Sequence, residues 1–219
     1  MTRALRRLEK IPKVWELLSF ILVFVLSAVL GANSVRHTDS TVPKASAQTP
    51  SPHHHLSVTP SLLNLQGKGA VLHKGSRGSV ILTMAPWCRF CAYEDRWVLP
   101  RIAQVYPSVA INVIDVSSMG GMASPGPEYP PFHGMDGRRT KSLPQKTVLS
   151  VMQQYINRLH LSQSTLNFYV IAPGQTDAPA TQAIPQWYIV NPQGNLVAHY
   201  QGALTSQQAI PWIHSLLNP

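Results

Sequence analysis

The only two cysteines of this 219-residue chain, Cys88 and Cys91, are separated by two residues, and no other feature constrains the fold as strongly. The run before them, residues 79–84, is apolar and rich in β-branched side chains, which is typical of a buried strand. Residues 92–105, which follow, carry apolar side chains at helical spacing. The pair is therefore predicted to lie at a strand-to-helix junction, where the helix dipole and the free N–H groups of the first turn favour a thiolate.

A thiolate at the start of a helix indicates a redox pair without a resident cofactor. Cys88, at the more exposed position, is expected to attack as the nucleophile, and Cys91, one helical turn later, to resolve the mixed disulfide. Two other interpretations stay open. Half of a tetrahedral zinc site would need a second pair of ligands, and the chain has no further cysteine. An inert disulfide would close so short a loop that it would contribute little stability.

The rest of the chain predicts further strands and helices. Strands are expected at residues 110–115 and 166–172, with a helix at 146–161 between them. A hairpin of strands at 186–190 and 195–200 follows, and a final helix is expected from Thr205, as N-cap, to Leu217.

This order of elements, βαβ and then ββα, resembles the thioredoxin fold, an α/β fold in which helices flank a central mixed sheet. That fold keeps a cis-proline just before the terminal hairpin, which is the place of Pro185 here. The resemblance implies that Pro185 exposes the backbone of Ile184 beside the sulfurs and that, with Trp87, this backbone binds an extended stretch of substrate polypeptide. A proline that merely begins an edge strand is the alternative.

Within this superfamily the chain most resembles the Dsb-type periplasmic thiol:disulfide oxidoreductases, in particular the DsbG/DsbC-like proteins. Phe90 stands directly before the second cysteine, Pro100 follows it by nine residues, and residues 62–75 resemble the linker helix and first strand of those catalytic domains. Two positions depart from the pattern. Ile184 stands where these isomerases have threonine, and Leu82 stands where thioredoxin has its buried aspartate, so that this proton acceptor is missing.

The N-terminal part predicts a membrane anchor and a tether. Residues 1–13 are basic and are expected in the cytoplasm, and the apolar run 14–32 is close to the minimum length of a membrane-spanning helix. Residues 33–58, rich in Ser, Thr and Pro, predict a flexible tether to one thioredoxin-like domain at 59–219. The expectation is a single-pass inner-membrane protein whose catalytic domain lies in the periplasm. A cleaved signal peptide is the competing interpretation of the same segment.

The composition bears on the partners. Charged residues make up 12% of the chain, against about 25% in ordinary domains. The net charge is +9, but the excess is scattered, without an arginine-rich stripe or stacking aromatic residues beside it. Nucleic acid is therefore not expected as a partner. The expected partners are exported protein thiols and disulfides and a redox partner protein.

An insertion, residues 117–145, holds a possible second site. Thioethers and imidazoles are suitable Cu(I) ligands, and the insertion contains four such side chains: Met119, Met122, His133 and Met135. This set supports an alternative function, a copper-binding or copper-delivery protein in which the two cysteines also act as ligands. The other interpretation is a substrate-facing loop whose methionines pack against its own aromatic residues.

Overall fold

A computed structural model describes residues 61–129, 133–139, 141–172 and 183–217. The predicted anchor at 14–32 and the predicted tether at 33–58 lie outside these residues. Within the described part of the chain, no helix is both long enough and apolar enough to cross a membrane.

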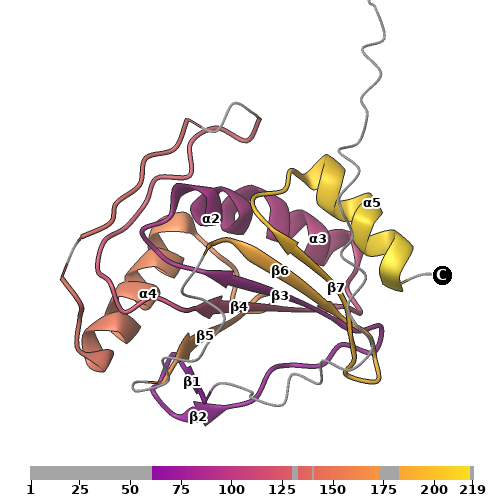
Figure 1. Ribbon diagram of the computed structural model, residues 1–219, viewed down its shortest axis with the longest axis horizontal. Helices are drawn as coiled ribbons and strands as arrows, with labels where there is room; N and C mark the ends of the chain where they lie inside the picture. Colours follow the sequence, from indigo (N-terminus) through magenta and orange to yellow (C-terminus); the bar gives the residue numbers. More distant parts are fainter. Residues whose placement is uncertain (1–60, 130–132, 140, 173–182, 218–219) are drawn as a thin grey trace, which may run out of the picture. The chain divides into compact units, whose positions relative to one another are not determined.

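The centre of the fold is a seven-stranded mixed sheet (Figure 1). Its middle strands run parallel: β3 (Ser79–Met84), β4 (Ala110–Asp115) and β5 (Asn167–Ile171). An antiparallel hairpin flanks each side, β6 (Gln186–Val190) with β7 (Leu196–Gln201) next to β3, and β1 (Leu62–Asn64) with β2 (Gly69–Ala70) next to β5. The strand order is β2-β1-β5-β4-β3-β6-β7. The predicted βαβ and ββα units thus share one sheet, and the predicted thioredoxin-like α/β fold is confirmed.

The helices follow the prediction with small shifts. After β3, the chain forms α2 (Arg89–Tyr93), a π-helical turn η1 (Glu94–Val98) and α3 (Leu99–Val105) in direct succession. The π-helical turn ends just before Pro100, which has no N–H to donate to the helical ladder, so the bonding pattern changes there. Helix α4 (Gln145–Leu159) joins β4 to β5, and α5 (Ser206–Leu217) ends the described chain.

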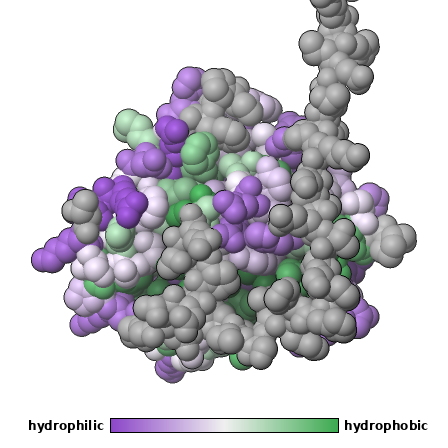
Figure 2. All heavy atoms as spheres, in the orientation of Figure 1, coloured by the Kyte–Doolittle hydropathy of each residue, from purple (hydrophilic) through white to green (hydrophobic). Residues whose placement is uncertain are grey.

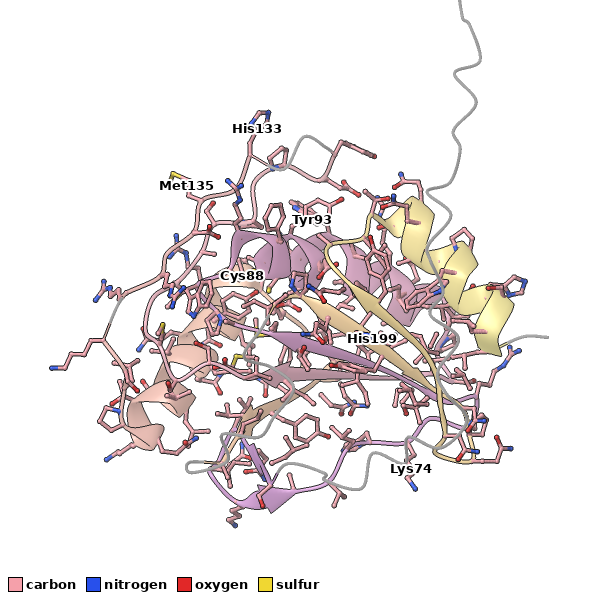
Figure 3. All side chains as sticks on the ribbon, viewed as in Figure 1. Lys74, Cys88, Tyr93, His133, Met135 and His199 are labelled. Carbon is pink, nitrogen blue, oxygen red and sulfur yellow. The ribbon has the colours of Figure 1, made fainter. Side chains whose placement is uncertain are left out.

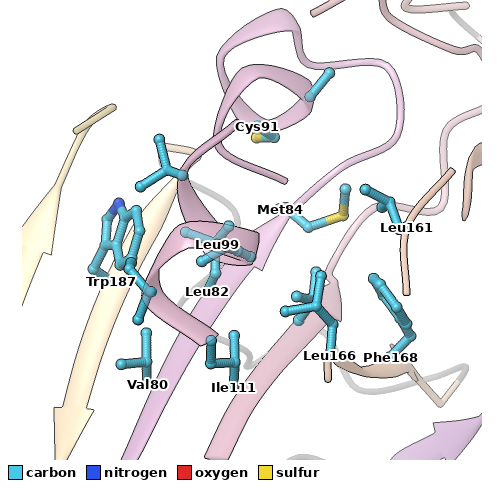
Figure 4. Packing of buried hydrophobic residues seen from close by; sticks show 14 of the residues in the cluster. Val80, Leu82, Met84, Cys91, Leu99, Ile111, Leu161, Leu166, Phe168 and Trp187 are labelled. Atoms are coloured by element: carbon cyan, nitrogen blue, oxygen red, sulfur yellow. The ribbon is translucent and has the colours of Figure 1, made fainter. Parts of the chain in front are cut away.

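The main hydrophobic core lies between the sheet and its helices (Figure 4). Alternate residues of β3, Val80, Leu82 and Met84, are fully buried in it, as the two-residue period of a strand requires. Leu82 pairs across the sheet with Trp187 of β6, so the position where thioredoxin has its aspartate is part of the apolar packing. Ile81 points to the opposite face and joins a smaller apolar cluster.

The segment 62–75 contains strands, as expected in part, but the linker helix that the resemblance implied for it is wrong. It begins with the β1–β2 hairpin at the sheet edge beside β5. The Asn64 side chain accepts hydrogen bonds from the backbone N–H groups of Gln66 and Lys68, and Gly67 supplies the left-handed backbone (φ 74°) that the tight turn requires. These local bonds favour a turn over a helix.

The insertion, residues 117–145, leaves the sheet at the same edge as the cysteine loop, because the ends of the parallel strands β3 and β4 are in register at Met84 and Asp115. Its two limbs run antiparallel, with bridges between Met119 and Ser142 and between Ser124 and Met135. We call this paired loop the insertion arm; it lies alongside α2 (Figure 1).

Candidate active site

Cys88 is the N-cap residue of α2, directly after the turn that follows β3. Its backbone is extended (φ −85°, ψ 119°), and its sulfur accepts a hydrogen bond from the backbone N–H of Cys91 at 3.3 Å. The sulfur therefore takes the place that a Ser or Asp oxygen occupies at an ordinary helix start. Both cysteines are free thiols in this structure, and the predicted strand-to-helix junction is confirmed.

The surroundings of the two thiols shift their pKa values in opposite directions. The pKa of Cys88 is lowered, chiefly because the Cys91 side chain donates a hydrogen bond to the Cys88 sulfur and because the backbone N–H groups of Cys91 and Phe90 do the same. The pKa of Cys91 is raised well above its ordinary value, first because that thiol is fully buried and then because of its contact with Cys88. When the pair loses one proton, the negative charge therefore settles on Cys88.

Cys88 opens into a cleft of about 470 Å³, in the size range of ligand pockets. Trp87 lines the cleft, and its indole N–H donates to the Ser117 hydroxyl at 2.8 Å, which fixes the ring. Ile184 also lines the cleft, and the Ile184–Pro185 peptide bond is cis. The structure thus brings Trp87, Cys88 and Ile184 to one cleft, whereas Pro185, the next residue of the chain, is buried and does not line it.

The helical stretch that follows the cysteines carries a buried carboxyl group, Glu94. The sequence analysis did not identify this residue. Glu94 is fully buried; one oxygen accepts bonds from the Trp187 indole at 2.8 Å and the Leu204 backbone N–H at 2.7 Å, while Oε2 has no partner among the described residues. Burial raises its pKa well above the ordinary value. Its position, three residues after Cys91 on a helix, could have indicated that both side chains point the same way.

Two more acids are buried in the domain, Asp95 next to Glu94 and Asp115 at the end of β4. The Asp95 carboxylate accepts a hydrogen bond from the Tyr155 hydroxyl at 2.5 Å, and burial raises the pKa of Asp95 to about 7. Asp115, at the end of β4, accepts the Ser117 backbone N–H at 2.9 Å, and burial raises its pKa to about 8. The domain thus holds acidic groups that retain protons near neutral pH.

The insertion arm clamps the cysteine loop by main-chain contacts. The Ala123 N–H donates to the Pro86 carbonyl at 2.8 Å, and the Gly137 N–H donates to the Trp87 carbonyl at 2.8 Å. Gly137 has to be a glycine, because a Cβ atom there would lie 1.9 Å from the Met122 carbonyl oxygen of the opposite limb. Arm and loop therefore form one packed unit around Cys88.

No family model matches the chain, and no curated protein matches it. Solved structures do match: MTB DsbF (19% identity, 71% of this chain and 93% of that chain, TM-score 0.46) and a thioredoxin-like protein from Aeropyrum pernix (17%, 71% and 88%, TM-score 0.47). A third is a secreted Mycobacterium tuberculosis disulfide oxidoreductase homologous to E. coli DsbE (16%, 70% and 93%, TM-score 0.46). The likeness to these structures is one of fold. The chain's own chemistry is inferred from the site described above.

The four side chains considered as copper ligands do not gather around the cysteines. Met119 lines the Cys88 cleft, whereas Met122 packs against the hydrophobic core. His133 and Met135 lie at the outer end of the insertion arm and point away from Cys88 (Figure 3). Within the described ranges there is also no cluster of three or more His, Cys, Asp or Glu side chains that could hold a metal ion.

Proposed function

We propose that the chain is a thiol:disulfide oxidoreductase that acts outside the cytoplasm on thiols and disulfides of exported proteins. One observation carries the proposal: the Cys88 sulfur caps the helix with its pKa lowered, while Cys91 behind it is fully buried with its pKa raised. This difference in pKa favours Cys88 as the attacking cysteine and Cys91 as the resolving one. The basic residues 1–13 and the apolar run 14–32 support a membrane anchor with the domain on the outer side.

In the first step, the Cys88 thiolate attacks one sulfur of a substrate disulfide. A bond forms between Cys88 and that sulfur, the substrate S–S bond breaks, and the other substrate sulfur leaves as a thiolate that takes up a proton. The backbone N–H groups of Phe90 and Cys91, which hold the charge on Cys88, orient the nucleophile toward the cleft.

In the second step, Cys91 attacks Cys88 and forms the intramolecular disulfide, and the remaining substrate sulfur leaves as a thiolate. The substrate has then gained two electrons and the protein has lost two. A reduced dithiol protein returns them by the same two exchanges in reverse, and with an oxidising partner the whole sequence runs backwards.

The second step requires that the buried Cys91 thiol lose its proton, and we assign the Glu94 carboxyl group, in its ionised form, as the acceptor. The Glu94 carboxyl group interacts electrostatically with Cys91, and its Oε2 atom has no hydrogen-bond partner among the described residues. A carboxylate whose pKa is raised by burial is a stronger base than an exposed one and therefore better matched to a thiol of raised pKa. Glu94 thus takes over the role for which Leu82 is unsuited.

The substrate segment is proposed to lie extended between Ile184 and Trp87, pairing with the backbone at Ile184 in the manner of strand addition. The Gln186 side chain donates to the Ala183 carbonyl at 2.6 Å and so orders the stretch just before the bond to Pro185. A pre-ordered backbone loses less entropy when the substrate strand binds.

The proposal is tested with the full chain in detergent and three versions: wild type, Cys88→Ser and Cys91→Ser. Wild type is expected to reduce a protein disulfide in the presence of a dithiol, Cys88→Ser to be inactive, and Cys91→Ser to accumulate mixed disulfides that appear as larger species on non-reducing gels. Full multiple-turnover exchange by Cys88→Ser would contradict the proposal.

A further inference from the structure

We propose that Arg138 makes the Cys88 cleft selective for cysteines that have an acidic residue beside them in the substrate polypeptide. This inference rests on the proposed exchange at Cys88 and adds the chemical class of segment that the site prefers. Arg138 belongs to the insertion arm, and it lines the same cleft as Cys88 and Ile184.

The Arg138 guanidinium group is held in place by neutral partners. Its central carbon lies 5.0 Å from the centroid of the Trp87 ring, and its Nε atom donates to the Met119 sulfur at 3.0 Å. Trp87 is itself fixed by its bond to Ser117. Among the described residues, no hydrogen bond or ion pair uses the two terminal nitrogens of Arg138. The two terminal nitrogens of the guanidinium group can bind a carboxylate with two parallel hydrogen bonds. They are oriented by the contacts with Trp87 and Met119, and no described residue uses them.

The carboxylates of the described residues are engaged elsewhere. Glu94, Asp95 and Asp115 are buried in the domain. Glu128 forms an ion pair with Arg101. Only Asp136 shares the cleft with Arg138, and its carboxylate accepts the Arg89 backbone N–H at 2.9 Å, at the start of α2.

Further basic residues near the cleft add to the positive charge of Arg138. Arg139 and Lys141 follow Arg138 on the same limb of the arm and are exposed. Figure 2 shows hydrophilic side chains gathered over this part of the molecule, at the left of the face in view. An acidic segment would be attracted to this edge before the exchange begins, and this attraction weakens with salt.

The mixed disulfide determines which substrate residues reach Arg138. When a substrate cysteine is joined to Cys88, its neighbours in an extended chain lie along the walls of the cleft, which Ile184, Trp87 and Met119 line together with Arg138. A Glu or Asp next to that cysteine then presents its carboxylate to the guanidinium fork. A Lys in the same place would meet a like charge.

The test uses three disulfide-containing peptides that differ only in the residue next to the cysteine: Glu, Gln or Lys. For the wild-type full chain, we expect kcat/KM to fall in that order, with about a three- to fivefold preference for Glu over Gln, the size of an exposed ion pair, and a smaller preference at high salt. Arg138→Gln is expected to remove the order. Arg138→Lys should restore part of it, because the charge returns without the planar fork.

Arg139→Gln is the matched control, because Arg139 is an exposed neighbour that does not line the cleft. It should keep the order of the three peptides. The ratio between peptides isolates recognition from any general effect of Arg138 on the cysteines, since such an effect changes all three rates alike. Equal rates of wild type on the three peptides, or an unchanged order in Arg138→Gln, would overturn the inference while leaving the exchange activity intact. Absence of exchange with every peptide would overturn the proposed function and this inference together.

Discussion

The carboxylate of Asp136 accepts a hydrogen bond from the backbone N–H of Arg89 at 2.9 Å, although 47 residues separate them in the sequence. This bond joins the insertion arm to the first residue of α2, directly beside Cys88. It also places a negative charge where the site develops a thiolate. Asp136 therefore opposes the helix start, whose N–H groups lower the pKa of Cys88.

Asp136→Asn tests this opposition, because the amide oxygen can still accept the Arg89 N–H while the charge is lost. The pKa of Cys88 should fall, and alkylation of Cys88 at a pH below that pKa should become about twofold faster. The measurement is the pH dependence of alkylation, with Asp136→Ala as the companion variant that removes both bond and charge. Slower alkylation of Asp136→Asn would contradict the assignment.

The hydrogen bond from the Cys91 side chain is the largest cause of the lowered Cys88 pKa. Cys91→Ala removes this donor and should raise the pKa of Cys88, so that more alkaline conditions are needed for half-maximal alkylation. Cys91→Ser keeps a donor and should raise it less. The pH dependence of Cys88 alkylation is compared between the two variants. Identical profiles would show that the hydrogen bond from the side chain at position 91 does not stabilise the thiolate.

Glu94→Gln should separate the two steps of exchange. The amide oxygen can still accept the Trp187 and Leu204 N–H groups, but the side chain no longer takes up a proton. Attack by Cys88 should continue, whereas resolution by Cys91 should slow by about a hundredfold, the usual contribution of a positioned base. Rapid-quench trapping of the mixed disulfide measures this, and undiminished resolution in Glu94→Gln would exclude Glu94 as the proton acceptor.

The buried acids predict how stability depends on pH. Because the pKa of Asp95 is raised to about 7 and that of Asp115 to about 8, the folded state holds more protons than the unfolded state between about pH 4 and those values. Stability should therefore be highest in mild acid and fall by a few kcal/mol as the pH rises to about 8. Chemical denaturation across this range measures the change. Asp115→Asn should flatten the curve, and a free energy of unfolding that rises with pH would refute the account.

The close approach of the two limbs of the insertion arm predicts a steric requirement at Gly137. Gly137→Ala should destabilise the domain by about 1–3 kcal/mol, because a Cβ atom has no room beside the Met122 carbonyl. Gly69→Ala is the control, since nothing lies within 4 Å of a Cβ atom there. Thermal unfolding compares the two, and an equally stable Gly137→Ala variant would disprove the close approach of the two limbs.

Much of the fold follows from local sequence patterns. The predicted strands at 110–115 and 186–190 coincide with β4 and β6, because runs of β-branched and aromatic side chains specify buried strands within a few residues. The helix start at Cys88 is likewise local, since the sulfur and the N–H groups that stabilise its charge are within three residues of each other. The linker helix expected within 62–75 rested on the resemblance alone, and the hydrogen bonds of the Asn64 side chain form a tight turn between two strands there instead.

The sequence by itself therefore determined the spacing of the two cysteines, their place at the end of a strand and the order of the elements around them, since each depends on neighbours along the chain. Only the tertiary structure decided what surrounds that pair. Register at the ends of β3 and β4 brings the insertion arm to the cysteine loop, where Asp136 accepts the Arg89 N–H at the start of α2 and Arg138 lines the cleft. Burial of Glu94 depends in the same way on Trp187 and Leu204. The physical reason is that charge, burial and close packing depend on distances in space, and residues far apart in the chain set those distances.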